Sequence, residues 1–237
     1  MIRFYAPEIQ DTLTLPESDS GHCVRVLRMG AGDRIEAVDG RGGLYRCIIR
    51  VPHPKHVAVE IEERLELSKV WPGSITVAVA PTKNIDRMEW LVEKLVEIGV
   101  DRIVPVSCRH SERKDIKVER LEKIAVSAMK QSLKAILPEI APMTPLRDFI
   151  ASRAGEGQNF IAHCMDDGCR RLMAREYRPG LDTAILIGPE GDFSPEEISL
   201  ALEAGWTPVT LGDNRLRTET AALVACDTCH ILNQRLL

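Results

Sequence analysis

Two glycine-bearing turns contain the residues whose types and spacing best suit ligand chemistry. The first, residues 187–193, contains Gly188 and Gly191, and the second, residues 210–220, contains Gly212. Each is expected at the end of a strand, and ligands of open parallel sheets bind beyond the carboxyl ends of strands. Glycine allows the backbone to approach a ligand closely, but it also occurs in turns that bind nothing. The glycines alone leave both interpretations open.

Charged residues of the second turn suit a site that stabilises charge. Arg215, Arg217 and Glu219 precede an apolar stretch, residues 221–226, that is typical of a buried helix. A guanidinium at the edge of a dry cavity can stabilise negative charge on a substrate, and a carboxylate can accept a proton or orient a neighbour. The alternative is an ion pair between Arg217 and Glu219 that only orders the turn.

Other motifs narrow the class of ligand. Neither turn contains GxxxxGK[ST] or a complete GxGxxG, so ATP and dinucleotides are not expected. Ser194 and Glu197 form a predicted capping box, which makes the acidic residues after the first turn structural. The segment Cys226–His230 matches the CxxCH pattern of haem attachment, but it lies in a predicted helix and supplies only two of the four ligands usual for zinc. No metal site is predicted.

The charge distribution predicts that one part of an acidic protein binds nucleic acid. The formal net charge is −4, whereas residues 102–134 contain nine basic and four acidic residues, an excess of five positive charges. Such a basic face suits a phosphate backbone. A solvated helix with ion pairs four residues apart, such as Glu119 with Lys123, would have the same composition.

Short β-rich segments dominate the first part of the chain. Runs with β-branched residues at 34–38, 44–51 and 57–61 are predicted strands, and one helix is predicted over residues 18–28. Strands at this spacing favour a small barrel. A linker near residues 68–73 ends this part.

Beyond the linker, predicted strands and helices alternate. The strands are expected at 75–80, 102–106, 160–163 and 183–187, and the helices at 85–98, 118–134 and 220–232. This alternation predicts a parallel sheet covered by helices on both faces.

The sequence also bears on compartment. No stretch approaches the ~20 apolar residues that cross a bilayer, and the first seven residues lack an apolar signal region. The seven cysteines are an odd number. Reduced thiols and a cytoplasmic location are therefore expected.

Together, the two turns resemble motifs of a known family. Leu186–Gly191, followed by Leu211, Gly212 and Leu216–Ala221, is similar to motifs of the RsmE family, the uracil-N3 methyltransferases of 16S ribosomal RNA in the SPOUT class. Similarities at residues 22–28, 86–100 and 119–131 extend the resemblance over nearly the whole chain. The chain departs from the pattern at Asp192, where the family often has a second glycine.

The resemblance implies an architecture, a cofactor and a reaction. It implies an α/β fold in which a PUA-like RNA-binding β-barrel, residues 1–71, precedes a SPOUT methyltransferase domain, residues 72–237, with a C-terminal trefoil knot. It also implies a homodimer that uses S-adenosylmethionine to methylate N3 of a uridine in 16S ribosomal RNA or the small ribosomal subunit.

Roles follow for individual residues. In that reaction Arg217 is the candidate for stabilising charge on the uracil, and Glu219 is the candidate general base or orienter. The resemblance implies that the cofactor contacts the backbone around Leu186, Gly188, Gly191, Leu211, Gly212, Leu216 and Thr218. The basic residues that we expect to contact RNA are Arg3, Arg25, Arg28, Arg109, Arg113 and Lys130.

Two other classes of function compete with this interpretation. A non-catalytic RNA-binding protein would keep the barrel and the basic helix. A nucleotide- or redox-cofactor enzyme would use the glycine turns together with Cys226 and Cys229. Binding of S-adenosylmethionine distinguishes the methyltransferase from both.

Overall fold

The structure is a computed structural model that describes residues 2–165 and 168–234. The chain forms two compact units. Unit 1 comprises residues 1–70 and 126–137, and unit 2 comprises residues 71–125 and 138–237. Each unit has its own sheet, and the two are described separately.

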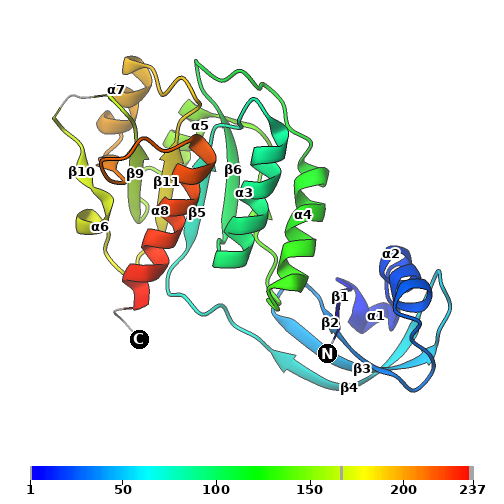
Figure 1. Cartoon of the computed structure of the whole chain (residues 1–237). Helices are drawn as coiled ribbons and strands as arrows, with labels where there is room; N and C mark the ends of the chain where they lie inside the picture. Colours follow the sequence, from blue (N-terminus) through cyan, green and yellow to red (C-terminus); the bar gives the residue numbers. More distant parts are fainter. Residues whose placement is uncertain (1, 166–167, 235–237) are drawn as a thin grey trace. The chain divides into compact units, whose positions relative to one another are not determined.

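Unit 1 is built on a four-stranded sheet, whose strands are labelled in Figure 1. Strands β1 (Arg3–Tyr5), β2 (Arg34–Val38), β3 (Gly43–Val51) and β4 (Ala58–Glu66) lie in that order. β1 pairs with β2 in parallel, and the other two pairs are antiparallel. The first two predicted strands are confirmed, and the third is longer than expected. The edge strand β1 was not predicted.

Short helices share a core with this sheet. They are α1 (Ile9–Thr12), α2 (Glu17–Gly21) and the π-helix η1 (His22–Val26). The prediction of one continuous helix over residues 18–28 is wrong in detail, because the helix widens at His22, whose carbonyl accepts from the N–H of Leu27 at 3.0 Å. The common core contains Phe4, Ile9, Leu15, Cys23, Ile35, Tyr45 and Ile49.

A segment from the middle of the chain completes unit 1. The N–H of Gly42 donates to the carbonyl of Ala135 at 3.0 Å, and the N–H of Leu137 donates to the carbonyl of Gly40 at 2.9 Å. These bonds attach residues 126–137 to the turn between β2 and β3. Unit 1 therefore contains chain from both sides of residue 71.

Unit 2 contains an eight-stranded sheet in which every described pair is parallel. The order is β10-β12-β9-β11-β5-β6-β7, and β8 pairs with β6. All five residues of β11 are buried, which explains its uninterrupted apolar sequence. The strands are β5 (Ile75–Val79), β6 (Arg102–Ser107), β7 (Glu139–Ile140), β8 (Thr144–Pro145), β9 (Gln158–Ala162), β10 (Arg171–Leu172), β11 (Thr183–Ile187) and β12 (Thr207–Thr210).

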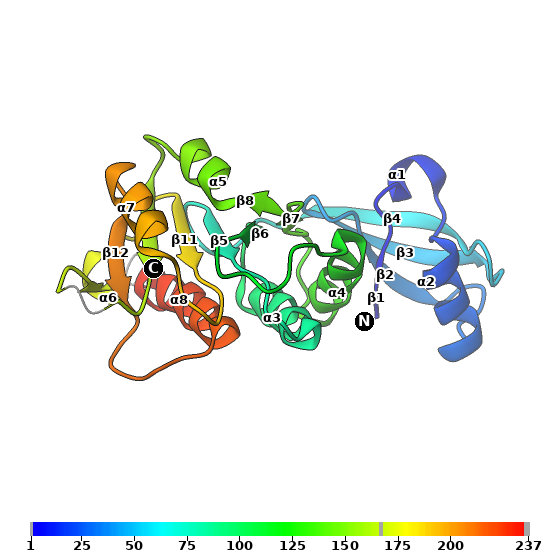
Figure 2. The same ribbon diagram turned by 90° about the horizontal axis from the view of Figure 1, so that it is seen from above.

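Helices cover both faces of this sheet, as predicted. Helices α3 (Ile85–Ile98) and α8 (Thr218–Asn233) pack on each other, and α8 also packs on β5 and β11. Helices α5 (Leu146–Ser152) and α7 (Pro195–Glu203) share a core with the side chains that point to the other face, including Leu186. Figure 2 shows α5 and the pair α3 and α8 on opposite sides of the strands.

Local signals in the sequence fix where two of these helices begin. Asn84 caps α3 by accepting the N–H of Asp86 at 3.0 Å. The capping box predicted before α7 is confirmed, because Ser194 and Glu197 each accept a hydrogen bond from the other's backbone. The remaining helices in the described part of the chain are α4 (Val118–Gln131) and α6 (Met173–Glu176). Within the described residues, no helix is long and apolar enough to span a membrane.

Candidate active site

A cavity of about 840 Å³ lies where three parallel strands of unit 2 end. Its walls are the segments 162–164 after β9, 187–192 after β11 and 209–218 after β12, together with single residues from other elements. This is the edge of a parallel sheet at which ligands are expected. The size falls in the range of small-molecule sites.

The cavity gathers six of the seven predicted cofactor-binding residues. Gly188, Gly191, Leu211, Gly212, Leu216 and Thr218 line it. Leu186 does not, because its side chain lies wholly inside the core on the face that α5 and α7 cover. The prediction concerns the backbone around Leu186, which directly precedes the lining residue Ile187, so it stays a prediction.

The glycines of the two turns serve different purposes. Gly212 has a φ of 128°, which disfavours any side chain, and a Cβ there would meet no described atom within 4 Å. Its backbone thus borders open space in the cavity. A Cβ at Gly188, in contrast, would lie 3.1 Å from the ring of Phe193, so this glycine allows close packing.

The departure at Asp192 has a structural explanation. Asp192 has a φ of 63°, a left-handed conformation that glycine adopts easily and aspartate tolerates better than most residues. Its carboxylate accepts the N–H of Cys164 at 2.8 Å. The side chain therefore connects the end of β9 to the turn after β11.

The structure separates the two predicted catalytic residues. Arg217 is the N-cap residue of α8, and its exposed side chain lines the cavity. Glu219 is only 7% exposed and is not among the lining residues. In the described structure Glu219 forms its ion pair with Arg87, at 3.7 Å, and none with Arg217. The alternative of an Arg217–Glu219 pair is therefore wrong.

Thr218 fixes the beginning of α8 to the first turn. Its hydroxyl donates to the carbonyl of Gly188 at 3.1 Å, and both residues are buried. This bond joins the two glycine turns directly, so the turns form one site.

Four polar residues of the cavity lie outside the two turns and were not predicted as site residues: Arg87, His163, Cys164 and Arg170. His163 and Cys164 follow β9. Because the carboxyl ends of parallel strands meet at one edge of the sheet, their position in the sequence was enough to predict them as cavity residues. Arg87, in the first turn of α3, belongs to a stretch that resembles the family, but its place beside α8 depends on how the two helices pack.

The predicted RNA-binding residues differ in exposure and in whether their side chains already bond to other residues. Arg25 and Arg28 are exposed and make no side-chain bond to any described residue. Arg109 is exposed in a surface ion pair with Glu196, which is weak and easily exchanged. Arg113 donates to the carbonyls of Thr82 and Lys83 and so has a structural role.

Two of these residues are engaged inside unit 1. The side chain of Arg3 is 8% exposed and pairs with Glu36 at 2.9 Å, and it also donates to the carbonyl of Leu133. Lys130 pairs with Asp19 at 3.0 Å, because its segment belongs to unit 1. The RNA contacts predicted for Arg3 and Lys130 stay predictions, and they require these ion pairs to open.

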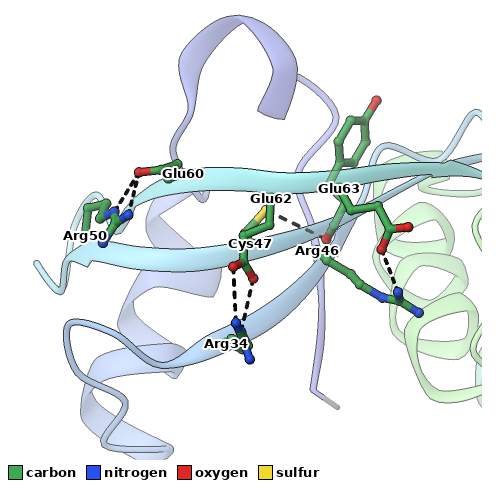
Figure 3. A network of polar contacts seen from close by, with 8 residues as sticks. Arg34, Arg46, Cys47, Arg50, Glu60, Glu62 and Glu63 are labelled. Carbon is green, nitrogen blue, oxygen red and sulfur yellow. Dashed lines mark hydrogen bonds and ion pairs between the residues drawn. The ribbon is translucent and has the colours of Figure 1, made fainter.

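The sheet of unit 1 neutralises its own surface charge. Figure 3 shows arginine–glutamate pairs across β2, β3 and β4. The exposed pairs are Arg34–Glu62 at 3.1 Å, Arg46–Glu63 at 2.6 Å and Arg50–Glu60 at 2.7 Å. Since each arginine faces a carboxylate, Arg25 and Arg28 on the helical side are better suited to a phosphate backbone.

The CxxCH segment is part of the core. Cys226 and Cys229 are fully buried in α8, and burial raises the pKa of Cys229 to about 12 and that of Cys226 well above its usual range. The thiol of Cys226 donates to the carbonyl of Gly99 at 3.3 Å. Both cysteines therefore behave as small apolar side chains.

Comparison with known proteins places this chain in a family. The profile described as an RNA methyltransferase domain matches residues 69–230, and one described as an RNA methyltransferase PUA domain matches residues 15–62. The ribosomal RNA small subunit methyltransferase E of Synechocystis is 30% identical over 226 residues, which cover 93% of this chain and 74% of that protein.

Solved structures agree over the full length. A probable rRNA-methyltransferase from Porphyromonas gingivalis is 48% identical, with a TM-score of 0.94 and complete coverage of both chains. The ribosomal RNA small subunit methyltransferase E of Neisseria gonorrhoeae, solved bound to S-adenosylmethionine, is 29% identical, with a TM-score of 0.86 and 98% coverage of each chain. With both profiles and the fold in agreement, the chain belongs to the RsmE family of ribosomal RNA small subunit methyltransferases that its two glycine turns resemble.

Proposed function

We propose that this protein transfers the methyl group of S-adenosylmethionine to N3 of a uridine in 16S ribosomal RNA of the small ribosomal subunit. The observation that carries the proposal is the cavity at three strand ends, in which the glycine turns and Arg217 meet. The names of the relatives and the ligand of the Neisseria protein support the same reaction.

The residues of the cavity fit this cofactor. Open backbone at Gly212 suits a flat base, and apolar side chains such as Leu211 and Leu216 lie beside charged ones in the lining. The cofactor supplies a methyl group already activated by a sulfonium, so the transfer needs no metal. We propose that the cofactor contacts the backbone around Leu186 and the lining residues Gly188, Gly191, Leu211, Gly212, Leu216 and Thr218.

The protein must then activate a weak nucleophile. N3 of uracil carries a proton, and negative charge spreads to O2 and O4 as that proton leaves. The exposed guanidinium of Arg217 can stabilise this charge at the edge of the cavity. Glu219 remains a candidate general base or orienter. Because N3 belongs to the Watson–Crick edge, the uridine must be unpaired.

We propose that the two predicted domains divide the work. Residues 1–71 would contact RNA through Arg25 and Arg28, with Arg109 as a further contact from the domain of residues 72–237 that holds the cavity. The absence of side-chain bonds from Arg25 and Arg28 to described residues supports this assignment.

Two further properties follow the family resemblance. We propose a homodimer built on unit 2, supported by the exposure of Trp90 on α3 and Ile231 on α8, 43% and 56%. We also propose a C-terminal trefoil knot, supported by a sheet order in which β12 lies beside β9 rather than β11. A monomer in light scattering at micromolar concentration would refute the dimer.

We also propose that the protein acts in the cytoplasm, where its RNA substrate is made.

The decisive experiment is methyl transfer in vitro. Purified protein, labelled S-adenosylmethionine and unmethylated small subunits should give one labelled nucleotide, which mass mapping should identify as N3-methyluridine. A non-catalytic RNA-binding protein would bind the subunit without transferring label. A nucleotide or redox enzyme would not bind S-adenosylmethionine. Either result would overturn the proposal.

A further inference from the structure

We propose that Arg87 is a second ligand-binding cation of the cavity, that Glu219 is its positioning residue, and that the Arg87 guanidinium binds an anionic oxygen of one of the two reactants. This inference rests on the proposed function and deepens it. It assigns Glu219 the role of orienter and not that of general base.

The first observation is the place of Arg87 and the length of its ion pair. Arg87 lines the cavity from the first turn of α3, and its side chain is 37% exposed. Its Nε lies 3.7 Å from a carboxylate oxygen of Glu219, within reach of an ion pair but too far for a hydrogen bond. No guanidinium N–H of Arg87 donates to a described residue. A cation is thus held at the cavity wall with its donors available.

The second observation is the burial of Glu219. Its side chain is 9% exposed and does not line the cavity, so its carboxylate is not presented to a ligand bound there. A buried carboxylate is costly unless a cation compensates it, and Arg87 is its ion-pair partner in the described structure. Glu219 is therefore arranged to act on Arg87.

The third observation is that the start of α3 is fixed to the cavity wall. Glu190, a cavity residue, accepts the N–H of Lys83 at 3.0 Å. Arg113 donates to the carbonyl of Thr82 at 3.2 Å and to that of Lys83 at 2.7 Å. These bonds hold the segment that leads into α3, so Arg87 is preorganised as a ligand-binding residue requires.

The chemistry of a free guanidinium identifies the ligand class. Arginine presents parallel N–H donors that match a carboxylate or a phosphate. In the proposed reaction these anions are the carboxylate of S-adenosylmethionine and the phosphate beside the target uridine. The experiment distinguishes the two sources.

The test compares Arg87→Ala, Arg87→Lys, Glu219→Gln and the double variant Arg87→Ala/Glu219→Gln. Lys94→Ala is the matched control, because Lys94 is a cation of the same helix that pairs with Glu97 at 3.0 Å and does not line the cavity. Calorimetry gives the affinity for S-adenosylmethionine, filter binding gives that for RNA, and single-turnover rates are measured against pH.

Arg87→Ala should lower the affinity for one of the two reactants by about ten- to a hundredfold, the usual effect of losing a charged hydrogen bond. Loss of S-adenosylmethionine affinity identifies the carboxylate, and loss of RNA affinity identifies the phosphate. Glu219→Gln should lower the affinity for the same reactant. It should leave the shape of the profile of single-turnover rate against pH unchanged. In the Arg87→Ala background it should have no further effect. Lys94→Ala should match the wild type.

Two results would overturn the inference. One is a folded Arg87→Ala protein with normal affinity for both reactants; if that variant fails to fold, normal affinities in Arg87→Lys count equally, since lysine cannot present the planar fork. The other is a Glu219→Gln effect that persists in the double variant and alters the pH profile, as a general base requires. A wild-type protein that neither binds S-adenosylmethionine nor methylates RNA would instead refute the proposed function.

Discussion

Thr218 offers the sharpest test of whether the two glycine turns form one site. Its hydroxyl is the donor that joins α8 to the carbonyl of Gly188, at 3.1 Å and out of solvent. Thr218→Val keeps the size and branching of the side chain and removes only this donor. We expect the variant to fold and to lose both stability and affinity for S-adenosylmethionine.

The size of the effect follows from burial. A buried carbonyl left without its donor costs about 1–3 kcal/mol. For a chain of this length each kcal/mol lowers the melting temperature by roughly 2–4 °C, so the loss should be roughly 2–12 °C. If the whole cost falls on the ligand-binding conformation of the turn, affinity should fall by roughly 5- to 150-fold.

Thr228→Val is the matched control on the same helix. The hydroxyl of Thr228 donates to the carbonyl of Val224 at 2.8 Å, four residues earlier, which already accepts a helical N–H. Its removal leaves no group unsatisfied. Differential scanning calorimetry and titration calorimetry of both variants give the comparison.

A Thr218→Val protein whose affinity for S-adenosylmethionine equals that of Thr228→Val would refute the reasoning. The bond would then stabilise the fold without shaping the cavity. Equal melting temperatures for the two variants would show that even its structural contribution is negligible.

Three other outcomes are expected. Arg217→Ala should bind S-adenosylmethionine normally but methylate about 100- to 1000-fold more slowly in single turnovers; near-normal turnover would leave Arg217 without a catalytic role. Replacing Arg25 and Arg28 by alanine should reduce the slope of log affinity against log salt by roughly 1.4 for single-stranded RNA, whereas Arg46→Ala, which removes a paired arginine, should change it little. Burial raises the pKa of Cys47 to about 11 and that of Cys229 to about 12 from the ordinary 9.0. The ionisation of these two thiols therefore leaves the free energy of unfolding unchanged below about pH 9. This free energy should fall above that pH, where the unfolded thiols ionise first; a denaturation midpoint that stays constant from pH 8 to 11 would contradict this.

Much of the active site was predictable from residues near one another in the sequence. The capping box at Ser194 and Glu197 fixed the start of α7, because both partners lie within one helical turn. The uninterrupted apolar run of β11 indicated a strand buried on both faces. Gly212 marked a turn that only a residue without a side chain adopts easily. These signals, and the motifs around them, were enough to indicate the parallel sheet, the two turns and the family.

The tertiary structure alone decided which charged residues are free. Arg3 and Arg25 look alike in the sequence, but Arg3 pairs with Glu36 on the neighbouring strand while Arg25 faces solvent. Glu219 lies two residues from Arg217, yet it pairs with Arg87 on another helix. The reason is physical: propensities and caps depend on neighbours along the chain, whereas an ion pair depends on where distant elements pack, and no local pattern specifies that packing.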